Sequence, residues 1–184
     1  MTIGKGITSV AGRRPMGPAV DNHGMDKALT EEDRTTAVGL ARYAYEYIEA
    51  AMLVEHNDPT PTHISPVPAY FLALHGIELT LKSYLRYKGV TAKELRGQKY
   101  GHDLHVCHKK AKELGLLSIF KEQANDADAM HMLVGLNEHQ GLRYIKTGMK
   151  QFPLWSLVEP LAVRLHQAVA TEVGYKSFNI TCHQ

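Results

Sequence analysis

Apolar residues recur at spacings of three and four along the chain, which is the pattern of amphipathic helices. The first such stretch starts at Thr30, a residue type that caps helices, and runs to about Glu55. Its apolar positions are Val38, Ala41, Tyr45, Ile48 and Met52. The most strongly patterned stretch begins near Pro68 and ends before Gly89. Its buried side is expected to carry Phe71, Leu74, Ile77, Leu81 and Leu85. The prolines between 59 and 68 predict an extended crossover between these two helices.

Weaker helical patterns, separated by glycines, fill the rest of the chain. We expect a short helix over 92–95, a longer one from about 102 to 114, one from Ser118 to about His139, and a last one from Leu154 to about Val173. Pro160 should kink the last helix or mark its beginning. No alternating pattern of strands occurs. The sequence therefore predicts an all-α, up-and-down bundle of five to six helices.

The length of 184 residues suits a single domain, which we place over 29–175. Residues 1–28 hold five glycines and few large apolar groups, so we expect a flexible tail there and a second, short tail over 176–184. No apolar run is long enough to cross a bilayer, and no secretory signal is visible. With only two cysteines, the chain is expected in a reducing cytoplasm, with no membrane partner.

Charge is unevenly distributed along the chain. Residues 21–58 carry nine acids against three Lys or Arg, whereas residues 82–112 carry nine Lys or Arg against two acids. An electropositive side of the fold would attract anionic partners, including nucleic acid. The alternative is a set of ordinary solvated helix faces.

Three polar residues, His75, Glu78 and Lys82, share one face of the second long helix beside its apolar stripe. Two interpretations are open. In the first, this face is exposed and Glu78 and Lys82 form a weak surface pair. In the second, they line a partly buried groove and pair with each other and with groups from neighbouring helices.

Histidines cluster where the helix over 102–114 begins. His102, His105 and His108 could offer imidazole ligands, but their spacing is not the i,i+4 pair with Glu that zinc peptidases use, so no metal is expected. Asp103 is expected to act as a helix-start acid and His102 as a group that titrates near neutrality. No phosphate-binding loop, dinucleotide fingerprint or nucleophile elbow occurs, so no cofactor is expected. Arg143 could reach a phosphate or form a salt bridge to Glu78 or Asp103.

Three segments, HGIELTLKSYL, KYGHDLHVCHKKAKELGL and GLRYIKTG, together resemble the HEPN superfamily of helical nucleotide-binding or RNase domains. The resemblance covers roughly residues 35–172. It rests on an acid and a lysine, here Glu78 and Lys82, a His-Asp-Leu run at His102, and an Arg-Tyr pair, Arg143 and Tyr144. It implies a HEPN-like helical bundle that forms a homodimer.

RNase members of that superfamily carry an arginine followed a few residues later by a histidine. Arg96 and His102 fit this order with five residues between them, whereas no histidine follows Arg143 until His166. In such chemistry, which needs no metal, a histidine acts as general acid or base and an arginine stabilises the phosphorane charge. The resemblance thus makes His102, Arg96 and Arg143 candidate catalytic residues in a degenerate motif.

Three hypotheses follow from the sequence. The first is an accessory protein that binds RNA or a nucleotide, with catalysis unproven. Its candidate ligand-binding residues are His75, Glu78, Lys82, Asp103 and Tyr144, beside His102 and Arg143. The second is an RNase of the toxin or phage-defence kind that needs no metal. The third is a protein–protein interaction module in which the polar cluster is a buried network that fixes helix register.

Overall fold

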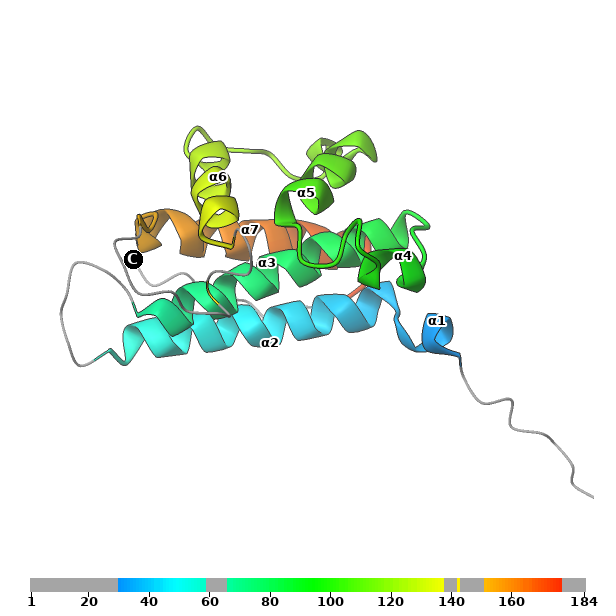
Figure 1. Cartoon of the computed structure of the whole chain (residues 1–184), viewed down its shortest axis with the longest axis horizontal. Helices are drawn as coiled ribbons and strands as arrows, with labels where there is room; N and C mark the ends of the chain where they lie inside the picture. Colours follow the sequence, from blue (N-terminus) through cyan, green and yellow to red (C-terminus); the bar gives the residue numbers. More distant parts are fainter. Residues whose placement is uncertain (1–29, 59–65, 138–141, 143–150, 177–184) are drawn as a thin grey trace, which may run out of the picture.

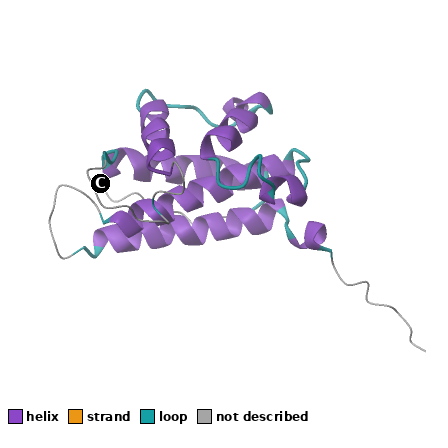
Figure 2. Cartoon of the chain, viewed as in Figure 1, coloured by secondary structure: helices purple, strands orange, loops and turns teal. Residues whose placement is uncertain are grey.

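The computed structural model describes residues 30–58, 66–137, 142 and 151–176. The elements in these ranges are α1 (Glu31–Arg34), α2 (Ala37–His56), α3 (Val67–Tyr87), α4 (Ala92–Arg96), α5 (Leu104–Glu113), the 3-10 turn η1 (Leu116–Ser118), α6 (Asp126–Asn137) and α7 (Trp155–Glu172). Figure 2 shows only helices and loops in this part of the chain. The all-α bundle is confirmed. The tail expected over 1–28 lies outside the described residues, as does all of the tail expected over 176–184 except Lys176.

Helix α3 occupies the centre of the bundle. It packs between α2 and α7. Helices α5 and α6 lie on the side of α3 and α7 that faces away from α2 (Figure 1). Helix α3 contacts α2, α4, α5 and α7. Its buried residues accordingly point in several directions and include polar ones, Glu78, Thr80, Lys82 and Ser83. A helix surrounded in this way carries into the interior even those side chains that flank its apolar stripe.

Small residues bring α2 and α3 close together. Ala41, Ala44 and Ala51 on α2 are buried, and Gly76 lies opposite them on α3. A Cβ atom at Gly76 would lie 2.6 Å from Ile48 Cγ1 and 3.1 Å from the backbone oxygen of Ala44. The absence of a side chain at position 76 therefore sets the distance between these two helices.

The expected first helix is wrong at its beginning. The chain forms α1, breaks at Thr35 and Thr36, and then starts α2, in which the extended Thr36 is the N-cap and its Oγ1 accepts a hydrogen bond from Gly39 N at 3.0 Å. Val38, expected on the apolar stripe, is 44% exposed. Thr36, and not the expected Thr30, therefore caps the long helix.

The expected helix from Ser118 also begins later, as α6 at Asp126. Asp126 lies at the start because its Oδ2 accepts a hydrogen bond from Gln123 N at 2.7 Å, and its Oδ1 accepts one from Arg164 Nη2 at 2.6 Å. Acidic and amide residues favour helix beginnings over helix interiors, which explains the shift. Pro160 lies inside α7, so it does not mark that helix's beginning.

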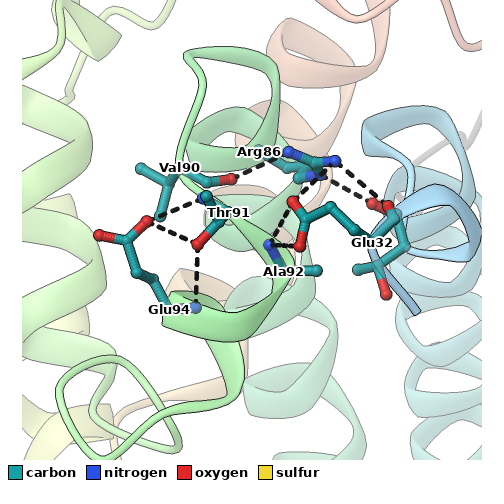
Figure 3. Close-up of polar contacts among 7 residues, drawn as sticks. Glu32, Arg86, Val90, Thr91, Ala92 and Glu94 are labelled. Atoms are coloured by element: carbon teal, nitrogen blue, oxygen red, sulfur yellow. Dashed lines mark hydrogen bonds and ion pairs between the residues drawn. The ribbon is translucent and has the colours of Figure 1, made fainter. Parts of the chain in front are cut away.

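A clasp of polar contacts, made by Arg86 and Glu32, ties α1 to the junction of α3 and α4 (Figure 3). The Arg86 guanidinium donates to the backbone oxygens of Thr35, Glu32 and Val90 and pairs with the Glu32 carboxylate at 3.0 Å. The same carboxylate accepts from Ala92 N at 2.9 Å. Helix α4 is further fixed by a capping box between Thr91 and Glu94.

Candidate functional site

The buried carboxylate of Glu78 is the centre of the candidate site. Only 2% of this residue is exposed. Its Oε1 accepts a hydrogen bond from Lys82 Nζ at 2.7 Å and lies 3.4 Å from Nδ1 of His102. Its Oε2 lies 4.0 Å from Nδ1 of His75. One carboxylate therefore lies against a lysine and two histidines.

His102 is held in place by the chain around it. Lys82 Nζ also donates to the backbone oxygen of Gly101, the residue before His102. From α6, Asn137 Nδ2 donates to the backbone oxygen of His102 at 3.1 Å. Asp103 then begins α5 as its N-cap, with its Oδ1 accepting from Val106 N at 2.9 Å. Side chains from α3 and α6 thus hold the backbone on the N-terminal side of α5, and this fixes the position from which the His102 imidazole projects.

The structure brings together four of the residues predicted from the sequence: His75, Glu78, Lys82 and His102. The interpretation of Glu78 and Lys82 as an exposed surface pair is wrong, because both are buried. Reversing the charge of Lys82 would place two carboxylates next to each other in the interior. Lys82 therefore acts as the buried counterion of Glu78, and not as a surface residue that is free to bind a ligand.

The other predicted residues lie elsewhere or outside the described ranges. The Asp103 carboxylate caps α5, as expected for a helix-start acid. Arg96 is exposed at the end of α4, on the same connection to α5 that carries His102. Arg143 and Tyr144 lie outside the described residues.

The three histidines at the start of α5 have different surroundings. His102 faces Glu78, His105 is exposed, and His108 Nε2 lies 3.3 Å from Glu122 Oε1. Burial is the main cause that lowers the pKa of His108. Over 30–58, 66–137 and 151–176, no group of three His, Cys, Asp or Glu side chains is arranged to hold a metal ion.

Cys107 lies near the cluster but is unsuited to act as a nucleophile. The residue is fully buried, and its thiol lies 3.4 Å from the backbone oxygen of Tyr100. Burial raises the pKa of the Cys107 thiol to about 12. The thiol therefore stays protonated at neutral pH, and the thiolate that nucleophilic chemistry requires does not form.

Pairing with acids reduces the positive charge expected over 82–112. Within the described part of the chain, ion pairs are formed by Lys82, Arg86, Lys88, Lys110 and Lys112 of that segment. Lys99, by contrast, is exposed beside the ring of Tyr100 on the α4–α5 connection. Lys99 is therefore an exposed cation that lies close in sequence to His102, on that connection.

His166 on α7 is a further buried titratable group, and no pattern in the chain around it indicates its burial. This residue is fully buried, and its Nε2 lies 2.9 Å from the backbone oxygen of Ala41 on α2. Because a carbonyl only accepts, Nε2 carries the proton of the neutral ring. The other nitrogen, Nδ1, is buried and meets no hydrogen-bond partner in the described part of the chain.

This burial predicts a pH dependence of stability. Desolvation lowers the pKa of folded His166 below the ordinary value of 6.5. The unfolded chain therefore binds a proton first as the pH falls, and the free energy of unfolding should decrease below about pH 6.5. Chemical denaturation of wild type and His166→Gln at pH 7.5 and 5.5 measures this. The decrease should be smaller in the variant, and an equal decrease in both proteins would contradict the assignment.

Among the helices that the structure describes, none combines the length and apolar character that a membrane crossing requires. No protein-family model matches this chain, and comparisons with curated proteins and with solved structures also found no match.

Proposed function

We propose that this protein binds RNA or a nucleotide at the Glu78–Lys82–His102 cluster. The observation that carries the proposal is the pairing of a buried carboxylate with a half-exposed histidine. Glu78 Oε1 lies 3.4 Å from His102 Nδ1, and 42% of the His102 side chain is exposed. This contact occupies one edge of the ring and leaves Nε2, on the other edge, to meet a ligand.

Charge near the cluster supports an anionic ligand. Arg96, the last residue of α4, and Lys99, on the α4–α5 connection, are exposed and close in sequence to His102. Glu78 balances the charge of Lys82, so contacts with phosphate fall to the cations of this connection. The resemblance to the HEPN superfamily supports the same class of ligand, and the homodimer that it implies stays a prediction.

Binding to a fluorescently labelled single-stranded RNA, measured by anisotropy over a range of salt concentrations, tests the proposal. Affinity should fall steeply with salt, because each phosphate contact releases counterions. Lys99→Glu should weaken binding by about tenfold at low salt and reduce the salt slope by about one.

Lys121→Glu is the matched control, because Lys121 is also exposed but follows α5 instead of preceding it. It should bind nearly as tightly as wild type. Salt-independent binding, or an equal loss in both variants, would remove the support for this location. A wild-type protein that binds neither RNA nor nucleotides would refute the proposal.

A second candidate, an RNase that needs no metal, is favoured by the same contact. A carboxylate that orients one nitrogen of a histidine prepares the other nitrogen to exchange protons. In this reaction His102 Nε2 takes the proton of a ribose 2′-hydroxyl, the 2′-oxygen bonds to phosphorus, and the bond to the 5′-oxygen breaks. The leaving 5′-oxygen then takes a proton from water, and His102 returns the proton that it accepted to the solvent, so the products are a 2′,3′-cyclic phosphate and a 5′-hydroxyl. Arg96 would stabilise the charge of the phosphorane.

A further inference from the structure

Three partly exposed aromatic rings lie next to the Glu78 cluster. Tyr47 comes from α2, and Phe71 and His75 come from successive turns of α3. The rings of Tyr47 and His75 meet edge to face, with centroids 4.5 Å apart. The rings of Phe71 and His75 are parallel to within 4°, with centroids 6.4 Å apart.

His75 connects this aromatic group to the polar cluster. Its Nδ1 lies 4.0 Å from Glu78 Oε2, while its ring contacts Tyr47 and is parallel to Phe71. The imidazole is therefore oriented from two sides, by a carboxylate and by the edge-to-face contact with a tyrosine. The result is a fixed set of aromatic surfaces beside a site that we propose for a nucleic acid.

An unpaired nucleobase is the ligand that this combination suits. Every base has a flat π-face that stacks on Phe, Tyr or His side chains, and proteins that bind single strands place such rings next to cations that hold the backbone. Here the cations are Arg96, at the end of α4, and Lys99, on the α4–α5 connection. In a duplex, the bases are already stacked on each other, so a single strand is the preferred form.

The spacing along α3 agrees with one nucleotide binding at both places. Phe71 precedes Glu78 by seven residues, which is two helical turns and about 10 Å along the axis. A base at the aromatic rings can therefore be joined by its own backbone to a phosphate at His102.

We propose that Tyr47, Phe71 and His75 form a stacking subsite for one base of a single-stranded RNA whose adjacent phosphate lies at His102. This inference rests on the proposed function and specifies its substrate as single-stranded. It also makes Tyr47 and Phe71 binding residues, although they lie outside the polar cluster.

The test uses a short single-stranded RNA that contains 2-aminopurine, a base whose fluorescence falls when it stacks. Wild type should quench this fluorescence on binding and should bind the matching duplex more weakly. Tyr47→Leu and Phe71→Leu should each lose about 5- to 100-fold in affinity and most of the quenching. Tyr47→Phe keeps the ring and should behave as wild type, which separates loss of stacking from loss of folding.

Tyr87→Leu is a control on the same helix, because Tyr87 is 48% exposed at the opposite end of α3. If it weakens binding as much as Tyr47→Leu does, the subsite is wrong. Salt-dependent RNA binding without quenching, and with unchanged affinity in Tyr47→Leu and Phe71→Leu, would overturn the stacking subsite and leave the proposed function intact. A wild-type protein that binds no RNA would overturn both.

Discussion

Glu78→Leu should lower the free energy of unfolding by about 3–5 kcal/mol, the typical cost of removing one partner of a buried ion pair. The Lys82 ammonium would remain in the interior with the backbone oxygen of Gly101 but without its carboxylate. Urea denaturation followed by circular dichroism measures the loss. Of the substitutions considered, this one should have the largest effect on stability.

The double variant Glu78→Leu/Lys82→Met should recover most of that loss, because it removes both buried charges together. Glu46→Leu is a matched control: Glu46 also forms an i,i+4 pair, with Arg42, but on the exposed surface. It should leave the denaturation midpoint nearly unchanged. A double variant as unstable as the single one would show that the loss of stability does not come from the unpaired charge of Lys82.

The double variant also separates a binding site from a structural network. If it folds and binds RNA as wild type does, Glu78 and Lys82 serve to fix the helices, as the interaction-module hypothesis requires. If it folds and loses RNA binding, the cluster has a role beyond stability.

If the protein cleaves RNA, as the second candidate function requires, His102→Ala should reduce the rate of cleavage by about 10²- to 10⁴-fold, the contribution typical of a positioned general acid or base. The side chain is 42% exposed and its removal leaves the Glu78–Lys82 pair in place, so folding should be preserved. The measurement is cleavage of a single-stranded RNA by the purified proteins in the presence of EDTA, with the products analysed for 2′,3′-cyclic phosphate.

His105→Ala is the matched control for cleavage, because His105 is exposed on the first turn of the same helix. It should cleave as wild type does. Equal activity in His102→Ala and wild type would exclude His102 from the chemistry. No cleavage by wild type would eliminate the RNase candidate and leave the binding proposal to be decided by affinity alone.

The periodicity of apolar residues was sufficient to predict the helices and the all-α class. It was insufficient at two helix beginnings, because local hydrogen bonds decide those. Thr36 caps α2 although Thr30 has the same chemistry, and Asp126 begins α6 through contacts with Gln123 N and the distant Arg164. The last of these contacts depends on tertiary structure, and no local pattern contains it.

The polar face of α3 could be identified from spacing alone, but its burial could not. Whether Glu78 and Lys82 are exposed to water depends on which parts of the chain pack against them. The α4–α5 connection does so, because Gly101 contacts Lys82 and His102 contacts Glu78. Asn137 joins the site from α6 with no signal in its neighbourhood. Phe71 was assigned to the apolar stripe, and only its geometry relative to His75 suggests a binding role.

The clasp between Arg86 and Glu32 determines where the chain can be truncated. Judged by apolar packing, a shortened protein could begin at Ala37, because α1 adds little to the hydrophobic core. Such a deletion would remove Glu32 and Thr35, and with them the carboxylate and two of the carbonyls that engage Arg86. A fragment that keeps Glu32 is therefore expected to be more stable than one that begins at Ala37, and the useful boundary is defined by a charge instead of by an apolar side chain.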